Sequence, residues 1–230
     1  MRFSKVSLNL ILITSLAFLY PANSKAAPTP SPTNAAPKLI TAPKGSTPPN
    51  YEISFNKGGK TTIDIWEDFQ CANCAKFHTI NGDFLSKVIS DGKIKINFHI
   101  LSFLGADSVV LANAAACAAD EGKFLPAHAQ LFKLQSENKN SGIWTNEFLQ
   151  TKMAEVGIGS TKFNKCIENK KYLKWVSAVQ RTATNSRILA TPTVLINGKA
   201  INRATDYYNS AAFESVVTDP SSIVAPSSIP

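Results

Sequence analysis

The chain has 230 residues, 44% of them hydrophobic and 17% charged, and a formal net charge of +8 at pH 7. Part of this charge comes from Arg2, Lys5 and Lys25 near the N-terminus, and the other lysines are scattered. No dense Lys/Arg tract interleaved with aromatic residues occurs, which argues against nucleic-acid binding. The apolar content suffices for one folded domain with an adequate core.

The first 26 residues have the features of a secretory signal peptide. A basic start without acidic residues is followed by an apolar run over residues 6–20, by Pro21, and by small residues at positions 24 and 26. The sequence predicts cleavage after Ala26 and therefore an extracytoplasmic protein. The alternative is an uncleaved N-terminal membrane anchor, although the run is short for a span of about 20 residues.

The remaining chain divides into three parts by composition. Residues 27–50 are rich in Pro, Ala, Ser and Thr, without periodic apolar residues, and we expect an extended linker there. Residues 51–218 are expected to form the folded domain, and residues 219–230 a disordered tail with the composition of the linker.

Apolar periodicity predicts the elements of the domain. Strands are expected at 51–55 and 61–66, joined as a hairpin across Gly58-Gly59, then a helix over 71–90 and a strand over 93–103. A helical insertion is expected over about 107–187, followed by a strand at 193–196 and a helix over 210–217. The predicted insertion helices span residues 108–121, 124–135, 144–156, 160–168 and 172–187.

Cys71 and Cys74 form a Cys-x-x-Cys pair where the second predicted strand leads into the first predicted helix. Strands alternating with helices indicate an α/β layer structure. The Cys-x-x-Cys pair at the strand-to-helix junction narrows this to a thioredoxin-like fold with an inserted helical subdomain. A helix N-terminus stabilises a thiolate, so Cys71 is expected to be the exposed nucleophile and Cys74 its resolving partner.

A metal or cofactor role for the same cysteines finds little support in the sequence. A structural zinc site needs four ligands, whereas the chain has one Cys-x-x-Cys pair. The three histidines, His78, His99 and His128, show no paired ligand spacing. Covalent haem attachment requires a histidine at position 75, which is Ala75. We therefore expect no metal and no cofactor, and we interpret His78 as a packing or surface residue.

Cys117 and Cys166 lie in separate predicted helices of the insertion. In an exported chain they are expected to form a structural disulfide, which leaves Cys71 and Cys74 as the redox pair. The alternative is two buried free thiols.

Three segments resemble the DsbA-like thiol–disulfide oxidoreductases. They are DFQCANCAKFH at residues 68–78, AACAADEGKF at 115–124 with His128 downstream, and ATPTVLING at 190–198. The resemblance covers about residues 60–217. It implies a thioredoxin fold in which Pro192 is cis and faces the cysteine pair, while the backbone of Thr191 pairs with an extended substrate segment. It also supports a structural Cys117–Cys166 disulfide.

The chain departs from this family at two places. Ala72-Asn73 stands where strongly oxidising members carry Pro-His, which predicts a less oxidising potential because neutral Asn stabilises a thiolate less than an imidazolium. Ile65 stands where relatives often place a buried acid that helps deprotonate the inner cysteine. Strand alternation places Asp64 on the opposite face, and Asp68 is expected in the loop before the helix, so water is left as the proton acceptor.

The sequence thus predicts an exported enzyme that forms disulfide bonds in unfolded or partly folded exported proteins through Cys71 and Cys74. A membrane-bound redox partner would recycle it. The alternatives are a disulfide reductase or isomerase of the same fold, and a non-catalytic peptide-binding or chaperone module.

Overall fold

The computed structural model describes residues 43–46, 51–138 and 141–224, all within a compact unit that spans residues 39–230. The predicted signal peptide, most of the predicted linker and residues 225–230 of the predicted tail lie outside the described residues. Within the part of the chain that is described, no helix is long and apolar enough to span a bilayer.

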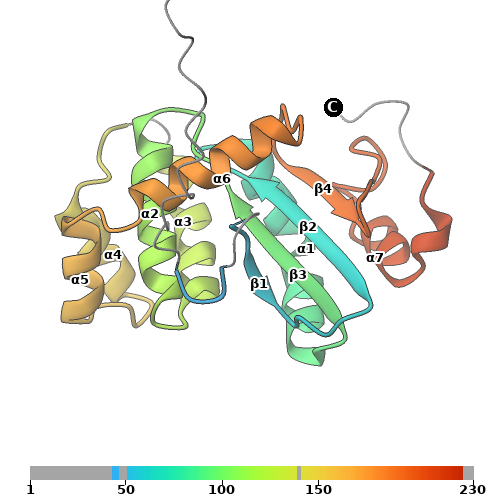
Figure 1. The fold of residues 1–230 in the computed structure, drawn as a ribbon, viewed down its shortest axis with the longest axis horizontal. Coiled ribbons are helices and arrows are strands. Elements are labelled where there is room, and N and C mark those ends of the chain that lie inside the picture. Colours follow the sequence, from blue (N-terminus) through green and yellow to red (C-terminus); the bar gives the residue numbers. More distant parts are fainter. Residues whose placement is uncertain (1–42, 47–50, 139–140, 225–230) are drawn as a thin grey trace, which may run out of the picture. The chain divides into compact units, whose positions relative to one another are not determined.

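A five-stranded sheet lies at the centre of the unit, in the order β1-β3-β2-β4-β5. The strands β2 (Thr61–Glu67) and β3 (Ile94–Ile100) are parallel, whereas β4 (Thr193–Ile196) runs antiparallel to β2. The edge strands are β1 (Ile53–Phe55) and the short β5 (Lys199–Ala200). Figure 1 shows this sheet with helices on both faces, which confirms the predicted α/β class with a thioredoxin-like fold.

The predicted hairpin between the first two strands is wrong. Strand β1 pairs antiparallel with β3, with Ile53 opposite Phe98, and β2 lies between β3 and β4. The central place of β2 has a physical reason, since Ile63 and Ile65 are fully buried and need neighbours on both sides. The sequence also did not predict β5, which pairs with β4 across the predicted Asn197-Gly198 turn.

Two helices cover one face of the sheet and a third covers the other. In Figure 1 helix α1 (Ala72–Asp91) lies behind the sheet and α6 (Leu173–Asn185) crosses its front. Helix α7 (Ser210–Thr218), to the right of β4 in this view, contacts α1. Helix α1 buries a stripe at helical spacing and ends at Gly92, whose φ of 72° is the left-handed conformation that glycine adopts readily. The predicted Asp91-Gly92 stop is confirmed.

The insertion comprises α2 to α6, as predicted, with ends shifted by a few residues. Helix α2 is its centre, because almost all of its alanine-rich surface is buried against α3, α5 and α6. The side chains of Thr145 and Ser160 cap α4 and α5 by accepting hydrogen bonds from the backbone. The bounds not yet given are α2 (Ala106–Ala119), α3 (Phe124–Asn138), α4 (Asn146–Ala154) and α5 (Thr161–Glu168).

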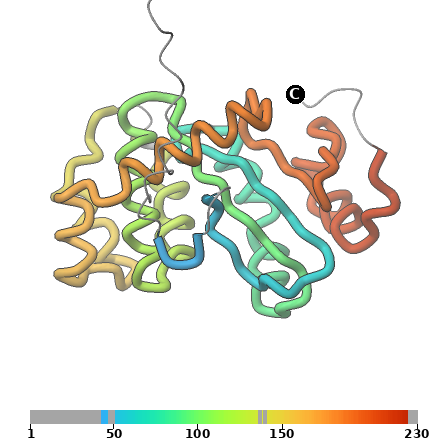
Figure 2. The backbone as a smooth tube through the Cα atoms, in the orientation of Figure 1, coloured from blue at the N-terminus to red at the C-terminus, as the bar shows by residue number. Residues whose placement is uncertain are grey.

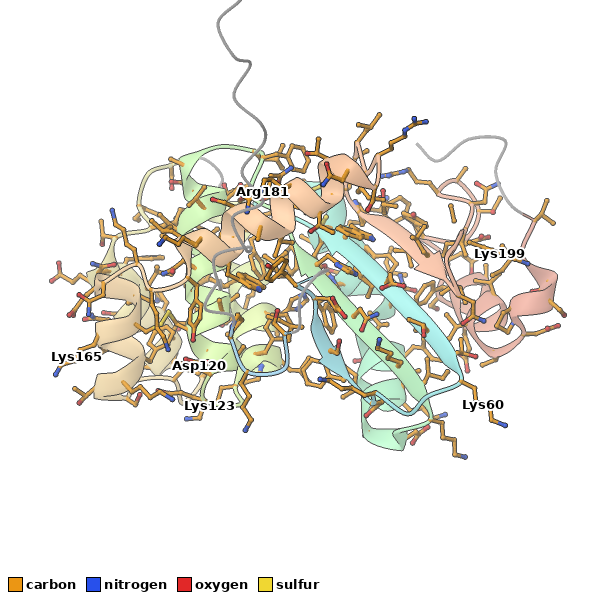
Figure 3. All side chains as sticks on the ribbon, viewed as in Figure 1. Lys60, Asp120, Lys123, Lys165, Arg181 and Lys199 are labelled. Carbon is orange, nitrogen blue, oxygen red and sulfur yellow. A yellow bond between two sulfur atoms is a disulfide. The ribbon has the colours of Figure 1, made fainter. Side chains whose placement is uncertain are left out.

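The folded part extends slightly beyond the predicted domain at both ends. Ser46 belongs to the predicted linker, yet it forms a β-bridge with Ile53 and accepts a hydrogen bond from Trp175 Nε1 at 2.9 Å. After α7, residues 220–222 form a 3-10 turn instead of beginning a disordered tail. The lysines labelled in Figure 3 point away from the core on separate elements, as expected for a solvated surface; they are Lys60, Lys123, Lys165 and Lys199.

Candidate active site

Cys71 and Cys74 lie at the start of α1, directly after the central strand β2. Cys71 is the N-cap residue with extended backbone angles, and Cys74 N donates to Cys71 O at 3.0 Å. Both are free thiols; the side chain of Cys74 is fully buried, whereas Cys71 retains 9% of its exposure. This is the predicted strand-to-helix junction. Cys71 was expected to be exposed, but it is buried at the helix start, and it is only the more accessible of the two cysteines.

The loop before β4 forms the opposite wall of the site. The Thr191–Pro192 peptide bond is cis, and the Cys71 thiol donates to the Thr191 carbonyl oxygen at 3.4 Å. Figure 2 shows β2 and β4 side by side, and Trp66 near the end of β2 pairs with Thr193. Sheet pairing therefore brings together two segments that lie 120 residues apart in sequence.

Two side chains hold this loop in place. Arg203 Nη1 donates to the Thr191 carbonyl oxygen at 3.3 Å, and the Tyr207 hydroxyl accepts from Val194 N at 2.7 Å. Asn81 of α1 in turn donates to Tyr207 O at 2.8 Å, which links the loop to the helix that carries the cysteines. Neither Arg203 nor Tyr207 was anticipated from the sequence, because neither lies in a recognisable motif.

The two thiols are strongly differentiated in acidity. A hydrogen bond from Cys74 lowers the pKa of Cys71; burial opposes this, and the side chain of Thr191 and the backbone of Asn73 and Cys74 lower it further, to about 6 from 9.0. Burial raises the pKa of Cys74 well above 9.0, and the Cys71 sulfur and the charge of Glu67 add to the rise. Of the two sulfurs, that of Cys71 therefore has the greater thiolate character, which is the property of an attacking or leaving sulfur.

This difference predicts the pH dependence of alkylation in the reduced protein. The rate of iodoacetamide reaction at Cys71 should be half-maximal near pH 6 and nearly flat above about pH 7.5, because the thiolate is the reacting species. In the Cys71→Ser variant, the remaining Cys74 should react slowly throughout this range. A midpoint near 9.0, the unperturbed cysteine value, would contradict the assignment.

The same shift determines how the stability of the reduced protein depends on pH. The folded-state pKa of Cys71 lies below its unfolded value of 9.0, so the unfolded chain binds more protons between about pH 6 and 9. The contribution of Cys71 to stability is therefore present above pH 9, and it is lost as the pH falls through about 6.

Behind Cys74 lies a cluster of one carboxylate and two imidazoles that was not predicted from the sequence. Glu67, the last residue of β2, is fully buried, and its two carboxylate oxygens contact His78 of α1 and His128 of α3. The distance from His128 Nε2 to Glu67 Oε1 is 2.7 Å. Burial alone would raise the pKa of Glu67, but the two histidines outweigh it and lower this pKa to about 2.

One signal for this acid was present in the sequence. Ile63, Ile65 and Glu67 alternate along β2 and so share one face, which places a carboxylate on the core side beneath the cysteines. Ile65 is indeed buried in the core, and Asp64 faces the other way, where it accepts from Asn97 at 2.8 Å. His78 therefore contacts a buried carboxylate and is more than a simple packing or surface residue.

The second cysteine pair lies in the insertion. Cys117 of α2 and Cys166 of α5 form a disulfide with Cα atoms 5.8 Å apart. It joins two helices of the insertion that contact each other, and Cys71 and Cys74 remain as the free thiols.

The cis-proline loop facing a Cys-x-x-Cys pair at a helix N-terminus, on this sheet, defines the thioredoxin-fold class of redox proteins. A family model described as thioredoxin matches residues 56–213, which is more than half of the chain. The chain therefore belongs to this thioredoxin family. No curated protein matches it at a significant level.

Solved structures share the fold. MdbA from Actinomyces oris, a thiol-disulfide oxidoreductase, superposes with a TM-score of 0.65 at 24% identity over 73% of this chain and 87% of its own. Reduced DsbG from Mycobacterium tuberculosis gives 0.60 at 26% identity over 83% and 87%. Oxidised DsbA from the same organism gives 0.59 at 25% over 79% and 90%. These neighbours confirm the resemblance to the DsbA-like oxidoreductases.

Proposed function

We propose that this protein is an extracytoplasmic thiol–disulfide oxidoreductase that forms disulfide bonds in exported proteins through Cys71 and Cys74. The observation that carries the proposal is the difference in pKa between the two thiols, which lie opposite the cis-proline loop. Cys71 keeps 9% of its exposure and has a pKa of about 6, while Cys74 is fully buried with a raised pKa. Disulfide exchange needs one sulfur that is a good leaving group, here Cys71, and a second that readily takes up a proton, here Cys74.

The exchange begins with the Cys71–Cys74 disulfide. A substrate thiolate attacks Cys71 Sγ, the bond to Cys74 breaks, and Cys74 leaves with the electron pair and takes up a proton because its pKa is high. A second substrate thiolate attacks the substrate sulfur of the mixed disulfide and expels Cys71 as a thiolate, which its low pKa favours. Two electrons pass from the substrate to the enzyme, and the substrate gains one disulfide.

The Thr191 carbonyl supports a role in binding an extended substrate segment. In the reduced structure this oxygen accepts from the Cys71 thiol as well as from Arg203. A Cys71 sulfur that is a thiolate or part of a disulfide has no proton to donate, so in both forms one acceptor position is free for a substrate N–H. The exposed side chains of Phe103 and Leu189, 44% and 76% exposed, offer apolar contacts to an unfolded chain.

The location and the partner are part of the same proposal. A structural disulfide such as Cys117–Cys166 is typical of oxidising compartments, which agrees with the signal peptide expected at residues 1–26. Each turnover leaves the cysteine pair reduced, so the enzyme needs an electron acceptor, and we assign this role to a membrane-bound redox partner.

The function is tested with reduced, unfolded substrate protein. The oxidised enzyme should restore substrate disulfides with stoichiometric loss of its own, and Cys74→Ala, charged first with a small-molecule disulfide, should accumulate a mixed disulfide at Cys71. Cys117→Ala/Cys166→Ala serves as the matched control that keeps the reactive pair. Failure of the wild type to oxidise the substrate would rule out the oxidase.

The potential of the Cys71/Cys74 couple separates the oxidase from a reductase or isomerase. We expect a value less oxidising than that of relatives with Pro-His between the cysteines, because Asn73 is neutral and its side chain is exposed. The Asn73→His variant should be more oxidising, by about 30 mV for each 1.4 kcal/mol by which the new imidazolium stabilises the thiolate. A strongly reducing couple in the wild type would favour the reductase, for which the similarity to DsbG is the supporting observation.

A further inference from the structure

The Glu67, His78 and His128 cluster has the composition of a metal-ligand set. The three residues come from β2, α1 and α3, and one ligand atom of each lies within 4.8 Å of the others. Two imidazole nitrogens and one carboxylate oxygen are the ligands of many three-residue zinc sites, and imidazole also suits copper, iron and nickel. Spacing in the sequence did not indicate this set, because its ligands come from three separate elements.

Aromatic side chains surround the cluster on one side, where they fix the two imidazole rings and exclude water. The His128 ring packs against Phe132 and Phe124, with ring centroids 4.9 Å and 5.4 Å away, and His78 stacks on Phe132 at 5.0 Å. An apolar shell of this kind fixes imidazole orientation and strengthens the attraction between a cation and a carboxylate. The side chain of Glu67 is fully buried, so its negative charge has to be compensated inside the protein. A divalent cation compensates that charge more strongly than the two hydrogen bonds with His78 and His128 do.

The opposite side of the cluster is open. His78 and His128 line a cavity of about 460 Å³ between α1 and α3, with Phe98 and Leu125 among its apolar walls and Asp83 and Lys133 among its polar residues. A cation held by the three side chains would therefore have a remaining coordination position facing this cavity. Three protein ligands with one open position are the arrangement of exchangeable zinc sites, whereas closed structural sites have four protein ligands.

We propose that Glu67, His78 and His128 form a binding site for a divalent transition-metal cation such as Zn²⁺, with an open coordination position towards the cavity between α1 and α3. Each imidazole binds through Nε2 and keeps its proton on Nδ1. Tetrahedral zinc requires ligand atoms roughly 3.3 Å apart. Rotation of the two imidazoles on the facing helices brings them to this spacing. The site does not depend on the proposed redox function, since it uses neither cysteine.

The test uses the complete chain after signal-peptide removal, without a histidine tag and with the Cys71–Cys74 disulfide formed, so that no reduced Cys-x-x-Cys pair competes for metal. Calorimetric titration with Zn²⁺ should show one equivalent bound, and Co²⁺ should produce the visible absorption of a low-symmetry N,O site. His128→Gln and Glu67→Gln should each weaken Zn²⁺ binding by more than about 100-fold, beyond the loss that a group outside the ligand shell causes.

His99→Gln is the matched control. His99 is also buried and contacts a carboxylate, with Nε2 3.0 Å from Asp64 Oδ1, but it has no second histidine in its pair. This variant should bind Zn²⁺ as the wild type does. If the ligand variants do not fold, histidine ¹⁵N resonances of the wild type decide the question, because Zn²⁺ should shift the Nε2 signals of His78 and His128 and leave that of His99 in place.

Two outcomes would overturn the site. One is the absence of a one-to-one step with Zn²⁺ in the oxidised wild type, which would leave the cluster as a hydrogen-bonded group only. The other is Zn²⁺ binding that is unchanged in His128→Gln, or that shifts only the ¹⁵N resonance of His99. Either result leaves the disulfide-exchange assay unaffected, so the two proposals fail separately.

Discussion

Removal of the Cys117–Cys166 disulfide is expected to lower the free energy of unfolding by about 4 kcal/mol. The bond closes a loop of 49 residues between α2 and α5, and in the chain-entropy model a cross-link of that length restricts the unfolded chain by this amount. For a domain of this size, the loss corresponds to a fall of roughly 10 °C in Tm. Activity of the Cys71/Cys74 pair should survive at temperatures where the variant stays folded.

The measurement is designed so that the reductant acts on one bond. In a Cys71→Ala/Cys74→Ala background, urea unfolding followed by circular dichroism is compared with and without dithiothreitol. In that background only Cys117 and Cys166 can change redox state, and no side chain differs between the two conditions. Equal urea midpoints would show that the disulfide contributes nothing to stability.

The Asp68→Ala variant is expected to lose about 3–5 kcal/mol of stability. The carboxylate is completely buried between β2 and α1, and it accepts four hydrogen bonds. Oδ1 accepts from Gln70 N at 2.8 Å and Ser108 Oγ at 2.7 Å, and Oδ2 accepts from Phe103 N at 3.1 Å and Leu104 N at 3.3 Å. Truncation leaves these donors without their acceptor, at about 1–3 kcal/mol for each one that water does not reach.

The same substitution should also impair disulfide exchange. Asp68 ties the residue before Cys71 to the loop after β3 and to α2, so its loss frees the segment that presents the reactive sulfur. The control is Asp83→Ala on the exposed face of α1, which should change stability by less than about 0.5 kcal/mol. Chemical denaturation of both variants checks the prediction, and similar losses in the two would refute the role assigned to Asp68.

Features that depend on local sequence could be predicted from the chain alone. The helix stop at Gly92 follows from glycine's access to positive φ, and strand β4 was predicted with the bounds that the structure has. The Cys-x-x-Cys pair at the β2–α1 junction, together with the later Thr191-Pro192, indicated the thioredoxin-like class. Alternating apolar residues along β2 and β3 indicated the sheet but not the order of its strands.

Features that depend on distant contacts were decided only by the tertiary structure. Strand β1 pairs with β3 instead of forming a hairpin, because sheet order depends on which apolar faces can be covered at the same time. Glu67 and His128 are 61 residues apart, and no spacing rule relates them. The sequence by itself therefore determined the class of fold and the position of the Cys-x-x-Cys pair within it. Only the packing of α1 and α3 against the end of β2 placed the carboxylate of Glu67 next to the imidazoles of His78 and His128. Such a cluster cannot be read from the sequence, because its members come from elements that meet only in the folded core.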